Sequence, residues 1–181
     1  MNELSLHILD LAQNAVSAGA ARVDISVRTD GDRLRIVIAD DGRGMDAELL
    51  ERVADPFTTT RPGRKVGLGI PLIKELCETC DGRFEIASRE GEGTTLSLEF
   101  RRSHIDLPPM GGLVDTMVTL VSGAPEGPEF RLRYANGGEE FAFDTAEIRG
   151  ALKGAPLNSP EVLGWVREYL AEGIEAAGKL A

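Results

Sequence analysis

Two pairs of segments in which apolar and polar residues alternate, each pair joined by a short turn, constrain the fold of the first hundred residues most strongly. The segments are residues 22–29 and 34–39, joined by Asp30-Gly31-Asp32, and residues 83–88 and 95–100, which lie either side of Gly91-Glu92-Gly93. A period of two predicts strands with one buried face, and short glycine-containing turns predict hairpins. The sequence therefore predicts two β-hairpins.

Helical periodicity before and between the hairpins predicts an α+β fold rather than an all-β one. Apolar residues recur at helical spacing from residue 4 to 18, and Gly19 marks the end of this helix. A short helix is predicted over residues 46–53 and a longer one over 67–80. Pro71 is compatible with the first turn of the second helix, since N–H groups there have no partner within the helix.

The character of the chain changes after Arg102. Pro108-Pro109 and Gly111-Gly112 interrupt it, so we place a boundary near Ser103 and expect two regions, 1–102 and 103–181. The second region is predicted to be a small α+β extension. Its elements are a helix over 113–121, a hairpin of 130–134 with 140–143 across Asn136-Gly137, a helix beginning at the Asp144/Glu147 capping box, and a last helix beginning at Ser159-Pro160.

Composition excludes several functional classes. The 181 residues include 20 Lys and Arg but 30 Asp and Glu, a net charge of −10, which argues against binding to nucleic acid or to an anionic membrane. No apolar run approaches the ~20 residues of a membrane span, and the start of the chain is acidic where a signal peptide would be basic. We therefore expect a cytoplasmic protein.

The two cysteines, Cys77 and Cys80, have the C-x-x-C spacing of redox motifs and zinc sites. They fall near the end of a predicted helix, where the helix dipole does not lower a thiol pKa. A zinc site would need two more ligands, and the only histidines, His7 and His104, are distant in the sequence. We interpret both cysteines as packing residues.

Asp10 and Asn14 are four residues apart and so lie on one face of the first helix. A carboxylate beside a carboxamide could polarise a hydroxyl group or water and hold a hard cation through oxygen. The alternative is a solvated helix face.

Asp40-x-Gly42-x-Gly44 follows a predicted strand. The glycines permit a close approach of backbone to ligand, and Asp40 could accept a hydrogen bond from an exocyclic amine. The alternative is a simple turn.

Gly67-Leu68-Gly69 opens the second long helix and follows Arg61, Arg64 and Lys65. Free N–H groups at a helix start bind phosphate, although a plain loop would have the same composition. The dinucleotide-binding fingerprint is absent, because Leu72 stands where its third glycine belongs, and there is no P-loop pattern.

The order of these motifs is more specific than any one of them. The helix with Asn14, Asp40-x-Gly-x-Gly, Asp55-Pro56-Phe57, the Thr-rich basic segment, Gly67-x-Gly69 and Gly91-Glu92-Gly93-Thr94-Thr95 resemble the GHKL superfamily of DNA gyrase B, heat-shock chaperones, histidine kinases and MutL. The resemblance covers residues 1 to about 102. It implies a two-layer α/β sandwich of the Bergerat type, with helices on one face of a mixed sheet, that binds ATP and Mg²⁺.

The resemblance also implies a role for each motif. Asn14 would bind Mg²⁺, Asp40 would recognise the adenine amino group with help from Thr94, and the cavity would include Gly42, Gly44 and Met45. Residues 58–66 would be the ATP lid, with Thr59, Arg64 and Lys65 as ATP-binding residues, and the backbone of Gly67, Leu68 and Gly69 would hold the phosphates.

Asp10 occupies the position at which related ATPases and anti-sigma-factor kinases have glutamate as the general base, so we expect a catalytic role for it. Neither His7 nor His104 has the His-Glu context of a phosphoacceptor. The leading hypothesis is a kinase-like regulator that transfers the γ-phosphoryl group to a separate protein, with a homodimer compatible with this reading. An ATP hydrolase acting as a conformational switch and a nucleotide-sensing module without chemistry are the alternatives.

Overall fold

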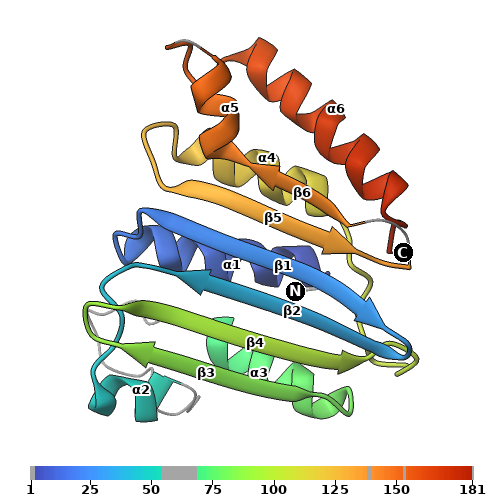
Figure 1. Cartoon of the computed structure of the whole chain (residues 1–181). Helices are drawn as coiled ribbons and strands as arrows, with labels where there is room; N and C mark the ends of the chain where they lie inside the picture. Colours follow the sequence, from blue (N-terminus) through green and yellow to red (C-terminus); the bar gives the residue numbers. More distant parts are fainter. Residues whose placement is uncertain (1–2, 54–68, 138–139, 153, 181) are drawn as a thin grey trace.

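One mixed sheet of six strands forms the centre of the computed structural model, which describes residues 3–53, 69–137, 140–152 and 154–180. The strand order is β3-β4-β2-β1-β5-β6 (Figure 1). The strands are β1 (Arg22–Asp30), β2 (Arg33–Asp40), β3 (Arg83–Arg89), β4 (Gly93–Arg101), β5 (Glu129–Ala135) and β6 (Phe141–Asp144). The helices are α1 (Leu4–Ser17), α2 (Ala47–Val53), α3 (Gly69–Thr79), α4 (Leu113–Gly123), α5 (Thr145–Ala151) and α6 (Pro160–Ala176).

Both predicted N-terminal hairpins are confirmed. β1 pairs with β2 and β3 pairs with β4, each antiparallel, and β2 joins the two hairpins by antiparallel pairing with β4. Because Ile25 lies opposite Ile38, and Ile38 opposite Leu96, one buried row crosses three strands on the same face. The same register sets Asp40 opposite Thr94, at the end of the sheet where the β2 strand terminates.

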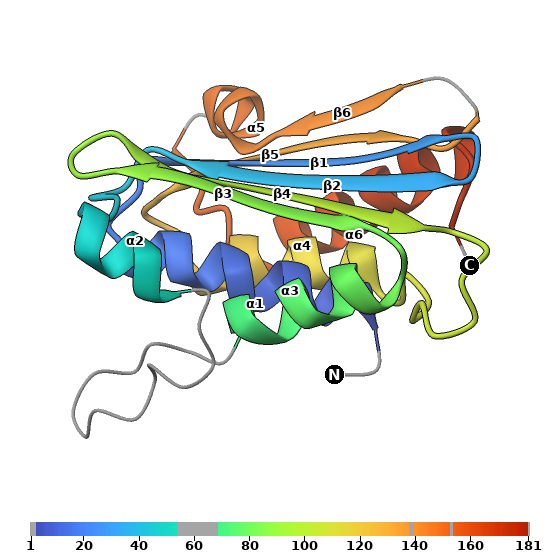
Figure 2. The ribbon, with the colours of Figure 1, turned by 90° about the horizontal axis from the view of Figure 1, so that it is seen from below.

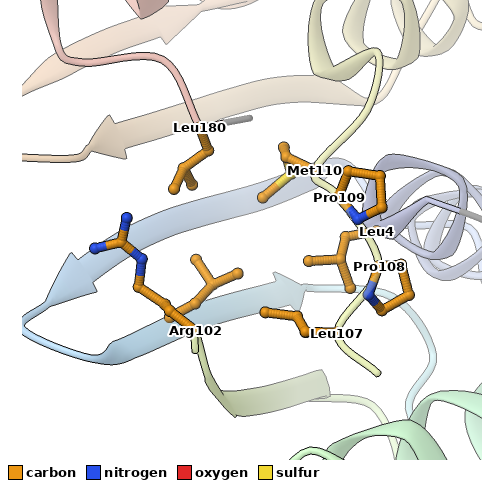
Figure 3. A pocket seen from close by; sticks show the side chains of 8 residues that line it. Leu4, Arg102, Leu107, Pro108, Pro109, Met110 and Leu180 are labelled. Atoms are coloured by element: carbon orange, nitrogen blue, oxygen red, sulfur yellow. The ribbon is translucent and has the colours of Figure 1, made fainter. Parts of the chain in front are cut away.

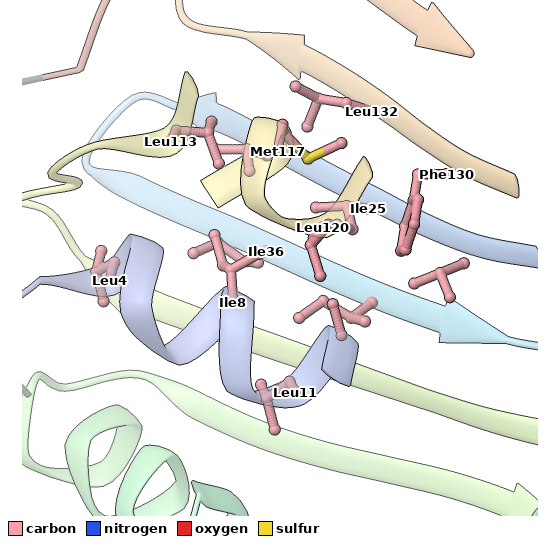
Figure 4. Packing of buried hydrophobic residues seen from close by; sticks show 14 of the residues in the cluster. Leu4, Ile8, Leu11, Ile25, Ile36, Leu113, Met117, Leu120, Phe130 and Leu132 are labelled. Carbon is pink, nitrogen blue, oxygen red and sulfur yellow. The ribbon is translucent and has the colours of Figure 1, made fainter. Parts of the chain in front are cut away.

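Helices α1, α3, α4 and α6 cover one face of the sheet, as predicted for this fold class (Figure 2). Figure 4 shows how side chains from α1 and α4 meet those of the strands. Ile8 of α1 and Met117 of α4 are each 0 % exposed. Burial of side chains of this size contributes roughly 1.5–3 kcal/mol each, so this layer fixes α1, which carries Asp10 and Asn14, against the sheet.

The residues after 102 extend the same sheet. β5 pairs in parallel with β1 over seven residues, from Arg22 opposite Glu129 to Arg28 opposite Ala135, and β6 pairs with β5 at the edge. Buried residues of α4, β5 and α6 belong to the same core cluster as those of α1. The predicted boundary at residue 103 therefore falls within one continuous sheet and core.

Both cysteines are buried in this core, with 0 % exposure and no disulfide. Burial raises the pKa of Cys77 to about 12 and also raises the pKa of Cys80. A buried, protonated thiol is a packing residue rather than a nucleophile or a metal ligand. Across the described residues no group of three or more His, Cys, Asp or Glu side chains could hold a metal ion. None of the described helices combines the length and apolarity that a membrane crossing needs.

Candidate functional site

A cavity of about 200 Å³ lies between α1, the end of β2, the loop that follows it, α2, the start of α3 and β4. Five residues predicted to bind ATP line it: Asn14, Asp40, Gly44, Met45 and Thr94. Its apolar wall comes from α1, α2, α3 and β4, through Leu11, Ala15, Leu49, Val53, Ile70 and Leu96. Four segments that are distant in the sequence therefore converge on one partly apolar space with a few polar groups, the usual composition of a small-molecule site.

Asp40 is half-buried at the carboxyl end of β2. The backbone N–H of Gly42 donates to Asp40 Oδ1 at 2.8 Å, which fixes the orientation of the carboxylate. Burial raises the pKa of Asp40, while hydrogen bonds from the backbone N–H groups of Gly42 and Thr94 act in the opposite direction. An ionised Asp40 carboxylate accepts hydrogen bonds, and in this partly desolvated place a ligand N–H group would be strongly favoured.

The loop after Asp40 is held against the turn between β3 and β4. Gly44 has a φ of +63°, and a Cβ at this position would overlap the carbonyl group of Arg89. The N–H of Gly91 donates to the carbonyl oxygen of Arg43 at 2.7 Å, which joins the same loop to the same turn by a hydrogen bond. Only glycine satisfies both the backbone conformation and the close approach, so the second glycine of the motif shapes the cavity wall.

Gly42 is buried and does not itself line the cavity. A Cβ there would lie 2.9 Å from Asp40 Oδ1 and 3.0 Å from the Cβ of Ala18. Gly42 therefore supports Asp40: its N–H holds the carboxylate, and its missing side chain leaves room for Ala18 at the end of α1.

Asn14 is exposed on α1 and lines the cavity, whereas Asp10, one turn earlier, is half-buried outside the lining. Asp10 lies instead against Gly69, the first residue of α3, where a Cβ would overlap Asp10 Oδ2. A carboxylate at a helix N-terminus is stabilised by the helix dipole. The two predicted residues Asp10 and Gly69 are thus brought together, beside rather than inside the cavity.

Ser88 is a site residue that the sequence did not reveal. From β3 its hydroxyl accepts the N–H of Met45 at 2.9 Å and lies 2.9 Å from Thr94 Oγ1 and 3.0 Å from the carbonyl oxygen of Gly93. It fastens two lining residues from outside the cavity. A serine in a strand carries no local signal of this kind, since its partners come from another strand and a loop.

Thr59, Arg64, Lys65, Gly67 and Leu68 lie outside the described residues. The contacts to phosphate predicted for them, and the lid over residues 58–66, therefore stay predictions.

A second cavity, of about 240 Å³, contains none of the predicted site residues (Figure 3). Leu4, Leu107, Pro109, Met110 and Leu180 form its apolar wall, and Arg102 is its one charged residue. It lies near the start of α1 and the start of β2, away from the ends of these elements that carry Asn14 and Asp40.

Comparison with known proteins identifies the same part of the chain. A family model described as histidine kinase-, DNA gyrase B- and HSP90-like ATPase matches residues 2–104. Sensor histidine kinase AruS of Pseudomonas aeruginosa is 32 % identical over 133 residues, covering 67 % of this chain and 13 % of that protein. Sensor histidine kinase YxdK of Bacillus subtilis is 34 % identical over 104 residues, covering 54 % of this chain and 32 % of that protein. This chain thus spans less than a third of the length of either relative.

A solved structure, the N-terminal domain of a DNA repair protein, superposes with a TM-score of 0.53 at 14 % identity, covering 78 % of this chain and 52 % of that one. At this identity the likeness concerns the fold alone. This superposition covers 78 % of this chain, whereas the match to an NtrY-like sensor histidine kinase of Rickettsia conorii covers 59 % of it. The larger coverage agrees with a sheet that continues after residue 102.

Proposed function

The chain belongs to the histidine kinase-, DNA gyrase B- and HSP90-like ATPase family, and from this premise we propose that it binds Mg²⁺-ATP in the cavity beside Asp40 and transfers the γ-phosphoryl group to a separate protein. The observation that carries the proposal is the convergence of Asn14, Asp40, Gly44 and Thr94, from three separate segments, on one cavity. ATP binding follows from the family. The location of the site in this cavity, the Mg²⁺ ion, the transfer step and its acceptor are all proposed.

The residues of the cavity fit an adenine nucleotide. The apolar wall would contact the faces of the base, and the Asp40 carboxylate, fixed by the N–H of Gly42, would accept from the exocyclic amine. Gly44 brings backbone rather than a side chain to the wall. These features favour a flat, hydrogen-bond-donating base.

Asn14 would hold Mg²⁺ through its side-chain oxygen. Mg²⁺ in nucleotide sites is usually bound by one or two protein ligands together with the phosphates and water, so a single carboxamide suffices. When bound, the ion would neutralise charge on the phosphates. The start of α3 lies beside Asn14's own helix, next to Asp10, and its N-terminal N–H groups favour anions.

Asp10 would act as the general base. In the transfer, the acceptor oxygen forms a bond to the γ-phosphorus while the bond from that phosphorus to the β–γ bridging oxygen breaks, which releases ADP. The proton of the acceptor hydroxyl passes to the Asp10 carboxylate. Such reactions depend mainly on positioning and charge neutralisation, so a carboxylate held near the phosphates is sufficient.

Incubation with γ-labelled ATP and Mg²⁺, alone and with a cell lysate, tests the proposal. Label on a protein other than this chain supports phosphoryl transfer in trans. Free labelled phosphate without labelled protein would make the chain an ATP hydrolase instead. ATP binding with neither product would make it a nucleotide-sensing module.

A further inference from the structure

We propose that Ser88 determines which base the cavity accepts. Ser88 accepts the hydrogen of the Thr94 hydroxyl, so that Asp40 and Thr94, the two neighbouring residues expected to contact the base, both present hydrogen-bond acceptors to the cavity. The inference rests on the proposed function, since it concerns the base of the nucleotide. Ser88 does not line the cavity. It acts through Thr94 and Met45, so it is a positioning residue.

The Ser88 hydroxyl has one hydrogen to donate and two lone pairs that can accept. The N–H of Met45, at 2.9 Å, can only donate, so it occupies one lone pair of Ser88 Oγ. The carbonyl oxygen of Gly93, at 3.0 Å, can only accept, so it takes the Ser88 hydrogen. Gly93 is buried, which makes this bond harder to replace with water.

The contact between Ser88 Oγ and Thr94 Oγ1, at 2.9 Å, is then decided. With the Ser88 hydrogen directed to Gly93, a hydrogen bond between the two hydroxyls needs the Thr94 hydrogen. In this arrangement the Met45 N–H, the Gly93 carbonyl and the two hydroxyl groups all have a hydrogen-bond partner. Thr94 therefore presents lone pairs, and no hydrogen, to the cavity that it lines.

Asp40 lies directly opposite Thr94 in the ladder between β2 and β4 and also lines the cavity. Its carboxylate is an acceptor as well. Two neighbouring acceptors require a ligand that donates at this edge, directly or through one water. The inference applies to the group at position 6 of a purine. There the amino group of adenine supplies two N–H donors, whereas the carbonyl oxygen of hypoxanthine or guanine has only lone pairs and would be repelled by the acceptors of Asp40 and Thr94.

Ser88→Ala removes the acceptor of the Thr94 hydrogen, so the Thr94 hydroxyl becomes able to donate into the cavity. ATP loses affinity, because its amine then meets one acceptor fewer. Inosine triphosphate, which carries a carbonyl at position 6, gains a donor. The affinity ratio of ATP to inosine triphosphate should fall by about tenfold, the effect of roughly one neutral hydrogen bond.

The test is titration calorimetry of both nucleotides, with Mg²⁺, into the full chain and its variants. Ser88→Thr keeps the hydroxyl and should restore the wild-type ratio. Ser97→Ala is the matched control, because Ser97 lies in the neighbouring strand β4 and makes no side-chain hydrogen bond within the described part of the chain. It should leave both affinities unchanged.

A Ser88→Ala protein that loses affinity for both nucleotides by the same factor would overturn the inference, since a purely structural role predicts that result. If Ser88→Ala does not fold, Thr94→Val decides. Loss of an acceptor should weaken ATP binding but not inosine triphosphate binding, and weakened inosine triphosphate binding would show Thr94 to be a donor and refute the inference. A wild type that binds neither nucleotide would refute the proposed function together with this inference.

Discussion

Gly44→Ala should destabilise the loop after Asp40 by far more than the backbone strain of an alanine at positive φ alone would. An alanine at φ +63° costs about 1–2 kcal/mol. Its Cβ would also lie 2.7 Å from the carbonyl carbon of Arg89, closer than real Cβ contacts, so the loop must move away from the β3–β4 turn. That movement breaks the hydrogen bonds from Met45 N to Ser88 Oγ and from Gly91 N to Arg43 O, at 2.9 and 2.7 Å. Each contributes about 1 kcal/mol, so the total loss is about 3–4 kcal/mol.

Gly31→Ala is the matched control. Gly31 has a similar φ of +57°, but no atom lies within 4 Å of the Cβ that would be added. This variant should lose only the conformational part, about 1–2 kcal/mol. Urea unfolding measures the free energy of unfolding of both variants. The expected difference of about 2 kcal/mol between them corresponds to roughly 6 °C in Tm for a chain of this size. ATP affinity should fall for Gly44→Ala alone. Equal losses of stability in the two variants would refute the packing argument.

Three further predictions concern single side chains. Because burial raises the pKa of Asp40, its folded-state pKa lies above its unfolded value, so its contribution favours folding at low pH and is lost as the pH rises through the folded pKa. Asp40→Asn should therefore not lower the Tm at pH 7, while calorimetry should show weakened ATP binding; a lower Tm with unchanged affinity would contradict this. Asp10→Asn should retain ATP binding but reduce turnover by about 10²–10⁴-fold, the range expected for loss of a general base, and equal phosphate release and acceptor labelling by both proteins would count against that role. Cys77 and Cys80, both 0 % exposed, should react with a thiol reagent at pH 8 only after unfolding, and rapid labelling of the native protein would show that the core opens there.

The hairpins and the first helix could be predicted from the sequence because their signals are local. Alternation within β1 and β2, and the turn at Gly31, specify a pairing between neighbours in the chain. The parallel pairing of β1 with β5 could not be predicted in this way. This pairing places Arg22 opposite Glu129, more than a hundred residues later in the sequence. The alternation within β5 predicts a strand but does not indicate which strand it pairs with.

The candidate site shows the same contrast between local sequence signals and long-range contacts. Asn14, Asp40, Gly44 and Thr94, which line one cavity, could be selected from the sequence because each belongs to a motif of fixed spacing. Ser88 could not, since its importance arises only when β3, β4 and the loop after Asp40 are assembled. The contact of Asp10 with Gly69 is also a product of tertiary packing, as α1 and α3 meet only in the folded layer.

A crystal structure of the chain with Mg²⁺ and a non-hydrolysable ATP analogue tests the central claim most directly. The proposed function places the adenine amino group within hydrogen-bond distance of the Asp40 carboxylate, with Thr94 beside it and the phosphates towards Asn14 and the start of α3. A nucleotide bound elsewhere, for example in the cavity around Arg102, or an adenine whose amino group points away from Asp40, would contradict it.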